Sequence, residues 1–499
     1  MTVLQMSKDF SHLYSIQTKT LKPSPLEVFM PLFYDPKIVF LGSGLPMSQY
    51  FPWKHIHSVC PRPPFLDGVG AVPSGREADT CTIMIPKDEA TPAGDTQDIV
   101  LARALQYGFG EGPPEILNFV QKHTEMIHDI KYADWDILLT IGNTAAWDLT
   151  LRVFCNRGDS ILAEKYSYSP PLCNAEGQGL NIIPVPMDEY GLVPTKLKAI
   201  LENWNPKKAM PKLLYTIPMG QNPTGVSLPE KRKKEIYEIA QAYDFLIVED
   251  DPYYFFQMDP YVEKPSERSD RSFGSRNDFI SSLARSFLSF DTDGRVIRLE
   301  SCSKTLGPGI RLGWIVGSKG ILENMERLSE ITVLSPSGIS LSIVAGTLNR
   351  WGQHGYLDWL IGLRREYTKK RDGALDACRE YLPNESWVEI IPPAAGMFFS
   401  IIIDASAHPD FRRKFHSKCN DVEQYLYQEF IAEGTLVFPS QFFEVGEKTD
   451  FSFQYAVDCK SEPHKIFFRG TYAAVSIEET REGIKRLGRV LKREFYALD

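Results

Sequence analysis

One lysine stands among small polar residues and glycines in the segment SCSKTLGPGIRLGW, residues 301–314. Serine hydroxyls and the guanidinium of Arg311 are suited to a phosphate, and the amine of Lys304 can form a Schiff base with a carbonyl compound. The apolar stretches VIRLE and WIVG on either side are typical of buried strands. A solvated surface turn is the alternative that this segment, taken alone, leaves open.

Three further polar motifs follow apolar runs that we expect to be strands. They are GNT at 142–144, NPTG at 222–225 and EDDPYY at 249–254. Proteins with α/β folds bind ligands at the carboxyl ends of their strands, and the N-terminus of a helix, expected after GNT, favours an anion. Each motif also has an ordinary alternative: N-capping by Asn143, a plain turn, or a solvated acidic loop.

Taken together, the four motifs supply the chemical groups that hold pyridoxal 5′-phosphate (PLP). A lysine forms the Schiff base, an acid pairs with the pyridinium nitrogen, and hydroxyls, backbone amides and an arginine hold the phosphate. Each motif has a high false-positive rate on its own. Their joint occurrence, each at the end of an expected strand, indicates a PLP site.

The elements that must position these motifs are short apolar runs separated by helical patterns. Most of the runs are apolar throughout, as expected for strands of a parallel sheet covered on both faces. They cover residues 136–142, 160–164, 181–186, 212–218, 245–250, 296–301 and 312–317. Residues 229–244 have the periodicity of an amphipathic helix. The alternation predicts an α/β fold, a large domain with a mostly parallel sheet flanked by helices.

The last third of the chain has a different pattern. Its apolar segments at 396–403, 435–440 and 465–475 are separated by longer polar stretches, which predicts a smaller α+β domain. A final helix is expected to begin at Ser476, with a capping box to Glu479.

We divide the chain into three parts. Residues 1–99 form an N-terminal arm and part of the small domain, 100–350 the large PLP-binding domain, and 351–499 the C-terminal small domain. Helical residues 351–382 are expected to connect the two domains. Segments 69–98 and 258–294 have little periodicity, so we expect surface insertions there.

Composition excludes several classes of protein. Apolar residues make up 43% of the 499 residues, charged residues 24% and aromatic residues 12%, as in folded globular proteins. The net charge of −9 disfavours nucleic acid as a partner. No apolar run is long enough to span a membrane, and the first residues do not resemble a signal peptide. The eight scattered cysteines contain no C-x-x-C pair, so we expect reduced thiols, no metal site and a cytoplasmic protein.

Motifs along nearly the whole chain carry a family resemblance. They are GSGLP (42–46), LARALQYG (101–108), GNTAAWDLTLRVFCNRGD (142–159), LLYTIPMGQNPTG (213–225), FLIVEDDPYYF (245–255), SKTLGPGIRLGW (303–314), YLDWLIGLRREYTKKRD (356–372), AAGMFF (394–399) and FFRGTYAA (467–474). This set resembles the fold-type-I PLP-dependent aminotransferases, and within them the fungal aromatic aminotransferase I group, related to kynurenine and α-aminoadipate aminotransferases. The two expected insertions lie outside the common family core and resemble those of the fungal branch.

The resemblance implies catalytic roles for three residues. Lys304 would form the internal aldimine and then move the proton between Cα and C4′. Asp250 would pair with the pyridine nitrogen and keep it protonated. Tyr168 would stack on the ring, although the neighbouring Tyr166 is the alternative in the segment EKYSYSPP.

The resemblance also implies how the rest of the cofactor is held. Asn222 and Tyr253 would hydrogen-bond O3′ of the ring. The phosphate would be bound by Asn143, Thr144, Ser301, Ser303 and Arg311. Tyr107 would reach the cofactor and substrate of a neighbouring subunit, which implies a homodimer with active sites at the subunit interface.

Arg469 stands between phenylalanines in an expected strand, where an unpaired charge would be costly to bury. An exposed position or a structural ion pair is the ordinary explanation. The resemblance instead implies a bidentate clamp for the substrate α-carboxylate, assisted by Asn222, Tyr107 and the backbone around Gly44.

The function that the resemblance implies is transamination by a ping-pong mechanism. The amino donors would be phenylalanine, tyrosine and tryptophan, and also 2-aminoadipate or kynurenine; the acceptors would be 2-oxoglutarate or aromatic 2-oxo acids. An aminoadipate or kynurenine aminotransferase with minor aromatic activity is the alternative. Another PLP enzyme, a PLP-dependent transcription regulator and a PLP-free scaffold are less favoured readings. The preferred donor, the direction of the reaction in the cell, the role of the insertions and the residues lining the side-chain pocket stay open.

Overall fold

The computed structural model describes residues 4–22, 37–39, 41–42, 44–65, 68–70, 79–88, 98–108, 110–268, 275–445 and 464–496. Contacts divide the chain into two units, each built from two segments. Unit 1 comprises Met1–Asp159 and Leu288–Trp359, and unit 2 comprises Ser160–Phe287 and Leu360–Asp499. The three-part division expected above stays a prediction.

Three strands of unit 1 are paired in the order β3-β11-β10, and both pairings are antiparallel. Its elements are α1 (Ile16–Thr20), β1 (His55–Pro61), β2 (Thr80–Pro86), α3 (Leu101–Ala104), α4 (Pro114–Ile127), β3 (Trp135–Thr140), α5 (Asn143–Phe154), β10 (Val296–Ser301), β11 (Gly313–Ser318) and α10 (Lys319–Glu330). Every residue of β10 (VIRLES) and β11 (GWIVGS) is buried, including the charged residues Arg298 and Glu300 of β10. Three of the predicted strands are therefore confirmed.

Strands β1 and β2 form an antiparallel hairpin that we did not predict. Strand β2 lies inside the segment 69–98, in which we found little periodicity and expected a surface insertion. Its sequence TCTIMIP alternates, and Cys81, Ile83 and Ile85 are buried. Ile83 and Ile85 pack with Leu101 in a small core of their own. The expectation is wrong for these residues; 71–78 and 89–97 lie outside the described residues.

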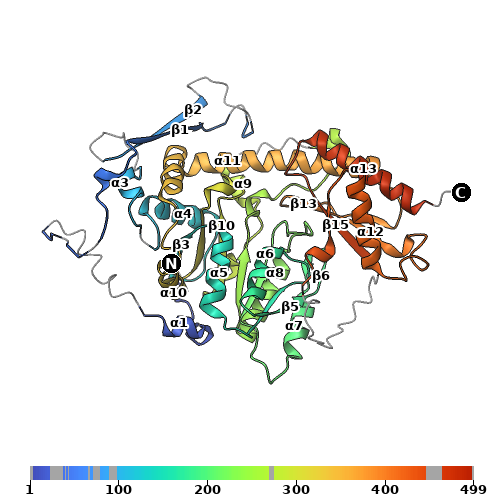
Figure 1. Cartoon of the computed structure of the whole chain (residues 1–499), viewed down its shortest axis with the longest axis horizontal. Helices are drawn as coiled ribbons and strands as arrows, with labels where there is room; N and C mark the ends of the chain where they lie inside the picture. Colours follow the sequence, from blue (N-terminus) through green and yellow to red (C-terminus); the bar gives the residue numbers. More distant parts are fainter. Residues whose placement is uncertain are drawn as a thin grey trace. The chain divides into compact units, whose positions relative to one another are not determined.

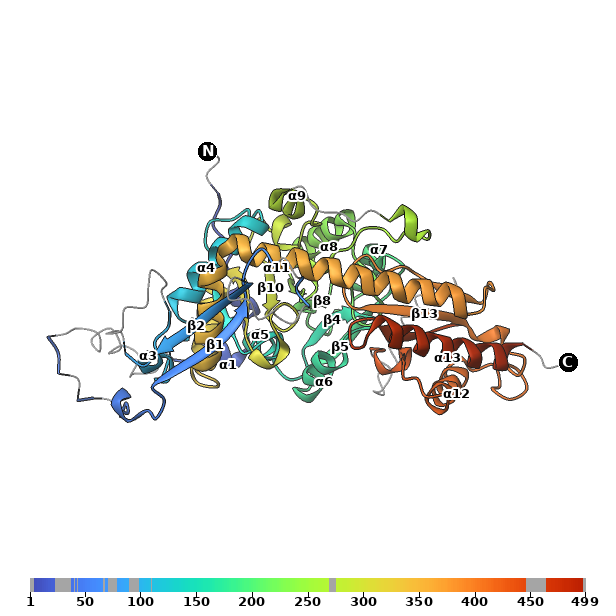
Figure 2. The same ribbon diagram turned by 90° about the horizontal axis from the view of Figure 1, so that it is seen from above.

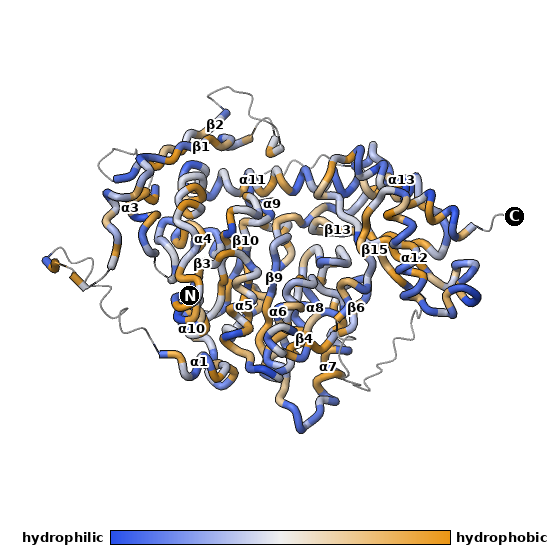
Figure 3. The backbone as a smooth tube through the Cα atoms, in the orientation of Figure 1, coloured by the Kyte–Doolittle hydropathy of each residue, from blue (hydrophilic) through white to orange (hydrophobic). Residues whose placement is uncertain are grey.

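Unit 2 contains four parallel strands in the order β9-β8-β4-β5. Its elements up to residue 287 are β4 (Ser160–Glu164), α6 (Ser169–Gly177), β5 (Asn181–Val185), β6 (Met187–Asp188), β7 (Gly191–Leu192), α7 (Pro194–Glu202), β8 (Leu213–Thr216), α8 (Glu230–Tyr243), β9 (Leu246–Asp250) and α9 (Arg276–Ser281). Figure 3 shows the hydrophobic character of the chain along β4. Parallel strands linked by helices confirm the predicted α/β class.

Unit 2 also contains an antiparallel sheet in the order β12-β13-β15-β14. Its strands and helices are β12 (Val388–Ile390), β13 (Phe398–Asp404), α12 (Cys419–Ala432), β14 (Phe438–Pro439), β15 (Lys465–Thr471) and α13 (Ile477–Phe495). Phe399, Ile401 and Phe468 from the sheet share a core with Leu426 and Leu487 from the helices. The α+β pattern predicted for the last third is present.

The segment 258–294 is not wholly a surface insertion. It contains α9, in which Phe279 is fully buried, and the buried residues Phe287 and Leu288 follow. The expectation of a surface segment is wrong there because scattered aromatic residues, rather than a periodic pattern, supply the buried contacts. Residues 269–274 lie outside the described residues.

Helix α11 (Gly338–Tyr381) carries the boundary between the two units and begins earlier than the predicted residue 351. Its helical geometry is interrupted at Gly352, where φ is +61°. The C-terminal half of α11 runs beside α13 in both views of the ribbon (Figures 1 and 2). At their contact a β-carbon on Gly488 would lie 2.3 Å from the Tyr381 carbonyl oxygen, so only glycine fits. No helix in the described part of the chain is both long and apolar enough to cross a membrane.

Removing the cap of helix α13 is expected to destabilise the fold by about 1 kcal/mol. Ser476 Oγ accepts a hydrogen bond from the Glu479 N–H at 3.1 Å, and a Glu479 carboxylate oxygen accepts one from the Ser476 N–H at 2.9 Å, as predicted. We expect Ser476→Ala to lower the midpoint of urea unfolding and Ser476→Asp, which keeps an acceptor, to preserve it. Equal midpoints for the alanine variant and the unmodified protein would show that the cap does not contribute.

Candidate active site

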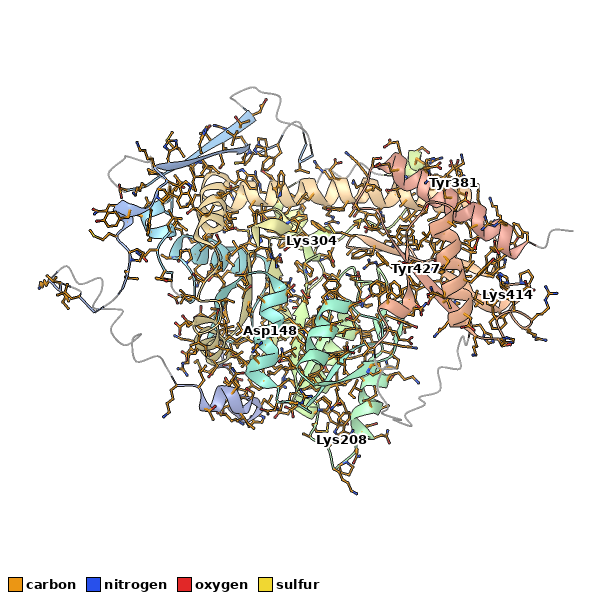
Figure 4. The ribbon with its side chains drawn as sticks, viewed as in Figure 1. Asp148, Lys208, Lys304, Tyr381, Lys414 and Tyr427 are labelled. Atoms are coloured by element: carbon orange, nitrogen blue, oxygen red, sulfur yellow. The ribbon has the colours of Figure 1, made fainter. Side chains whose placement is uncertain are left out.

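The segment that carries Lys304 is a closed turn between β10 and β11. The Cys302 N–H donates to the Leu312 carbonyl at 3.0 Å, and the Leu306 N–H donates back to the Cys302 carbonyl at 2.8 Å. Ser301 is the last residue of β10, and Lys304, labelled in Figure 4, follows three residues later. The turn thus fixes the backbone that presents Ser301, Ser303 and Lys304.

Arg311 returns from this turn to the start of helix α5. Its backbone has a positive φ of +52°. Its Nη1 donates to the Pro308 carbonyl at 3.0 Å and lies 3.5 Å from Ser303 Oγ, while its Nη2 donates to the Ile141 carbonyl at 3.0 Å. The structure therefore brings Arg311, Ser303 and the N-terminus of α5 together, as the phosphate-site prediction requires.

Helix α5 begins with Asn143 and Thr144, and its N-cap residue is Gly142. A β-carbon on Gly142, where φ is +91°, would lie 2.6 Å from Arg311 Nη2, so glycine leaves space beside the guanidinium. Asn143 donates from Nδ2 to the Leu299 carbonyl at 3.1 Å and does not cap the helix. The alternative of simple N-capping by Asn143 is wrong, because the N-cap residue is Gly142, which has no side chain to cap α5.

A buried ionic group stabilises strand β10 just before the lysine turn. Glu300 accepts a hydrogen bond from Arg298 Nε at 2.6 Å and lies 3.4 Å from His128 Nε2. Burial would raise the pKa of Glu300, but Arg298 and His128 outweigh it and hold that pKa at about 2. Burial raises the pKa of the Cys302 thiol to about 12, so this cysteine is a packing residue and not a nucleophile.

In unit 2, the two acidic residues at the end of β9, Glu249 and Asp250, have different hydrogen-bond partners. Asp250 is buried and accepts a hydrogen bond from Tyr215 Oη at 2.6 Å. Glu249 accepts one from the Phe287 N–H at 2.8 Å and so supports the chain that follows α9. Burial, and then the charge of Asp250, raises the pKa of Tyr215 well above its usual value, so this phenol stays a hydrogen-bond donor. The hydrogen bond from Tyr215 can therefore orient the Asp250 carboxylate toward the ring nitrogen of a bound cofactor.

Asn222, Tyr253 and Arg469 form a second cluster in unit 2. Arg469 Nη1 donates to Asn222 Oδ1 at 2.6 Å, which leaves the Asn222 amide nitrogen available as a donor. Tyr253 is buried, and burial followed by the charge of Asp250 raises its pKa. A hydrogen bond with Asn222 acts in the opposite direction on the Tyr253 pKa. Three residues that sequence analysis assigned to the cofactor ring and the substrate are thus neighbours.

The guanidinium of Arg469 lies among three phenylalanine rings. Its central carbon is 4.6 Å from the ring centre of Phe398, 5.2 Å from Phe438 and 4.6 Å from Phe443. Burial lowers the pKa of Arg469. Within the described parts of the chain no carboxylate forms an ion pair with it, and it is not an exposed strand residue. Neither ordinary explanation for Arg469 therefore holds, and its guanidinium remains suited to an incoming carboxylate.

Tyr166 and Tyr168 have different surroundings. The Tyr166 ring packs edge-on against Phe467, with ring centres 5.0 Å apart. Tyr168 is 38% exposed and lies close enough to Tyr253 and Arg469 to affect the pKa of both. This placement favours Tyr168 over Tyr166 as the residue that stacks on a ring, a role that stays a prediction.

Gly44 and Tyr107 lie in unit 1 and are both exposed. Tyr107 lines a cavity of about 660 Å³ together with Leu45, Arg103 and Pro336. The predicted roles of Gly44 and Tyr107 toward substrate and a neighbouring subunit stay predictions.

Sequence analysis missed several residues that support the candidate site. Tyr215 contacts Asp250, Phe438 and Phe443 flank Arg469, and Glu164 contacts Gln221 near Asn222. The position of Tyr215 in a strand parallel to β9 was an available signal, because neighbouring strand ends meet at one edge. The phenylalanines carried no comparable signal, since isolated aromatic residues are common in any core.

The chemistry of these side chains suits PLP. Unit 1 supplies hydroxyls, a guanidinium, helix N–H groups and a lysine, which match a phosphate and a carbonyl carbon. The space that Gly142 leaves beside Arg311 would be filled by any larger residue. Unit 2 supplies a buried carboxylate for a ring nitrogen, an amide and a phenol for a ring oxygen, and a guanidinium for a carboxylate.

Comparisons with known proteins agree with this chemistry. Residues 103–487 match the family model described as aminotransferase class I and II. The chain is 37% identical to an aromatic amino acid aminotransferase of Schizosaccharomyces pombe, over 98% of each chain. It is 30% identical to an L-tyrosine:2-oxoglutarate aminotransferase of Serpula lacrymans, over 98% of this chain and 96% of that protein. The crystal structure of the aminotransferase Aro8 from Candida albicans is similar, with a TM-score of 0.92 and 43% identity over 98% and 99% of the two chains.

Proposed function

Since the chain belongs to the class I and II aminotransferases, we propose that it transfers the amino group of phenylalanine, tyrosine or tryptophan to 2-oxoglutarate or to an aromatic 2-oxo acid. The fold is that of the fold-type-I enzymes, as the sequence predicted. The observation that carries the proposal is Arg469, which is paired with Asn222, flanked by three phenylalanines and suited to a carboxylate. The names of the relatives from Schizosaccharomyces and Serpula support the aromatic and 2-oxoglutarate parts.

This family depends on PLP, and the residues described above would give each part of the cofactor a partner in this chain. Asn143, Thr144, Ser301, Ser303 and Arg311 would hold the phosphate, and Asn222 and Tyr253 the ring oxygen. When bound, the cofactor withdraws electrons from the substrate Cα. Lys304 would then take the proton from Cα with its amine, while Asp250 keeps the ring nitrogen protonated. Tyr168 would cover one face of the ring.

Arg469 would bind the α-carboxylate of the amino acid in one half-reaction and that of the 2-oxo acid in the other. A clamp of this kind favours transamination over decarboxylation, because decarboxylation requires the carboxylate to leave. The phenylalanines around the guanidinium give an apolar environment, which favours an aromatic side chain over the acidic side chain of 2-aminoadipate.

Replacing Arg469 by lysine should raise KM for both substrates. Lysine keeps the charge but loses the planar pair of donors, so we expect kcat/KM to fall by about 10- to 100-fold for phenylalanine and for 2-oxoglutarate alike. Steady-state kinetics with each substrate varied in turn measure this. Arg486→Lys on helix α13, where Arg486 pairs with Glu482, is the matched control and should behave as the unmodified enzyme. A rise in KM for one substrate only would contradict a shared clamp.

A panel of amino donors tests the substrate proposal. With 2-oxoglutarate as the acceptor, we expect kcat/KM to be higher for phenylalanine, tyrosine and tryptophan than for 2-aminoadipate and kynurenine. Activity confined to 2-aminoadipate or kynurenine would replace the aromatic assignment by the alternative one. Inactivity toward every donor with PLP bound would overturn the transaminase proposal itself.

We further propose a cytoplasmic homodimer with active sites at the subunit interface. Large apolar side chains of the N-terminal part, Met47, Tyr50, Trp53 and Tyr107, are more than half exposed in the single chain and would be covered by a second copy. The seven cysteines in the described residues are free thiols, in keeping with a reducing compartment. Light scattering should give twice the chain mass of 56.6 kDa, and a mass of one chain would contradict the dimer. A fluorescent fusion confined to a membrane-bound organelle would contradict the location.

A further inference from the structure

A buried carboxylate with no role in the chemistry above lies at the end of strand β4. Glu164 is fully buried and receives three hydrogen bonds. Thr216 Oγ1 donates to one carboxylate oxygen at 2.7 Å, and the Ile217 N–H and Gln221 Nε2 donate to the other at 3.2 and 3.0 Å. Burying a carboxylate is costly unless hydrogen bonds compensate for the lost water, and these three donors supply such compensation.

The side chain of Gln221 extends this contact in two directions. Its Nε2 also donates to the Tyr166 carbonyl at 2.6 Å. Its Oε1 accepts from the Thr224 N–H at 2.9 Å and from Thr224 Oγ1 at 2.7 Å. Gln221 therefore ties the end of β4 to the segment that leads to Tyr168 and to the turn that contains Asn222.

Two of the residues assigned to the ring, Asn222 and Tyr168, lie close in sequence to this contact. Asn222 directly follows Gln221 in the chain, and Tyr168 comes two residues after Tyr166. Asn222 must also keep its Oδ1 toward Arg469 if its amide nitrogen is to reach a ring oxygen. A small shift of the turn would disturb the ring contact and the carboxylate clamp together.

We propose that Glu164 and Gln221 form a positioning pair that holds Asn222 and Tyr168 in place for the cofactor ring. The proposal rests on the function proposed above. It assigns neither residue a contact with substrate or cofactor. A purely structural role, in which the pair only stabilises the fold, is the competing explanation.

The ionisation of Glu164 gives the pair a distinctive pH dependence. Burial, with a smaller contribution from the charge of Asp250, raises the pKa of Glu164 to about 7, although its three donors act in the opposite direction. The titratable groups that interact with Glu164 from the neighbouring strands are Asp250 on β9 and Tyr215 on β8. As the pH falls below about 7, the Glu164 carboxyl takes up a proton. The protonated oxygen then becomes a hydrogen-bond donor, so one acceptor of the pair is changed.

Two alanine variants and the conservative variant Glu164→Gln test the pair. Each is studied as the PLP-loaded enzyme and as the apoenzyme titrated with PLP. Glu164→Ala and Gln221→Ala should each weaken cofactor binding about tenfold, measured by quenching of intrinsic fluorescence. They should also shift the pH at which the visible absorption of the bound cofactor changes, in the same direction as Asn222→Ala. Glu164→Gln keeps an acceptor for Gln221, so it should bind PLP within about threefold of the unmodified enzyme at pH 8.

The conservative variant also carries the pH test. Between pH 8 and pH 6 the ratio of its cofactor affinity to that of the unmodified enzyme should rise, because only the native carboxyl takes up a proton in this range. Asp291→Asn is the matched control: Asp291 is another buried carboxylate with backbone donors, at the start of β10, and its replacement should leave the cofactor readouts unchanged.

The outcomes separate this proposal from the proposed function. If the Glu164 and Gln221 variants melt at lower temperature but bind PLP and titrate as the unmodified enzyme does, the pair is only structural and the proposal fails. If an alanine variant does not fold, the test relies on the soluble Glu164→Gln variant. A ratio of its PLP affinity to that of the unmodified enzyme that does not change between pH 8 and pH 6 overturns the proposal. If the unmodified protein does not bind PLP, the proposed function fails first.

Discussion

Lys304→Ala is expected to lose transamination by about 10⁴-fold, the upper end of the range for a positioned proton-transfer group. Alanine removes the only amine of the turn between β10 and β11 and leaves the backbone contacts of Cys302 with Leu312 and Leu306 in place. The visible absorption of lysine-bound PLP should disappear, while phosphate contacts from Ser301, Ser303 and Arg311 keep some cofactor bound without a covalent link. Stopped-flow absorbance and a coupled transamination assay measure the two effects.

The matched control is Lys319→Ala, which removes an exposed lysine at the start of helix α10 in the same unit. It should retain both the visible absorption and the activity. A Lys304→Ala enzyme with the absorption and rate of the unmodified protein would rule out Lys304 as the residue that carries the cofactor.

Asp250→Asn is expected to lower kcat by about 10²- to 10³-fold with little change in KM. An amide can still contact a ring nitrogen and the Tyr215 hydroxyl, but it has no negative charge to keep that nitrogen protonated. The loss should therefore fall on the step that removes the Cα proton, and a substrate deuterated at Cα should show a larger isotope effect than with the unmodified enzyme.

Glu249→Gln tests whether the loss in kcat is specific to Asp250 or follows from removing either negative charge of the motif. Glu249 is adjacent in the sequence and equally buried, but its carboxylate accepts from the Phe287 N–H, a contact that glutamine can keep. It should leave kcat and the isotope effect unchanged. Equal losses for the Asp250 and Glu249 variants would mean that the motif stabilises the fold and does not act on a ring.

Much of the fold could be predicted because most of its central strands are largely apolar runs. Strands β4 and β10 have the predicted bounds, and the capping box at Ser476 is present. The hairpin of β1 and β2 was missed because its seven-residue strands lie among polar segments. The start of α11 was missed because residues 338–350 contain several small residues, which weaken a helical pattern.

The candidate site was predictable in its residue types and only partly in its contacts. Arg311 and Ser303 meet because the turn that joins β10 and β11 is short, so the sequence carried that information. The hydrogen bond between Tyr215 and Asp250 depends on the parallel register of β8 and β9, which pairs Tyr215 with Val248. The contact of Glu164 with Gln221 spans 57 residues and depends on the order of strands in the sheet. Strand order and register are tertiary properties that apolar patterning does not specify.

The first half-reaction, run alone, is the most direct test of ping-pong transamination by this protein. The PLP-loaded protein is mixed with an excess of phenylalanine, without any 2-oxo acid, and phenylpyruvate, ammonia and carbon dioxide are quantified. We expect one phenylpyruvate for each chain, loss of the visible absorption and its return on addition of 2-oxoglutarate. Carbon dioxide or free ammonia as the product, or no phenylpyruvate from a protein with PLP bound, would contradict transamination.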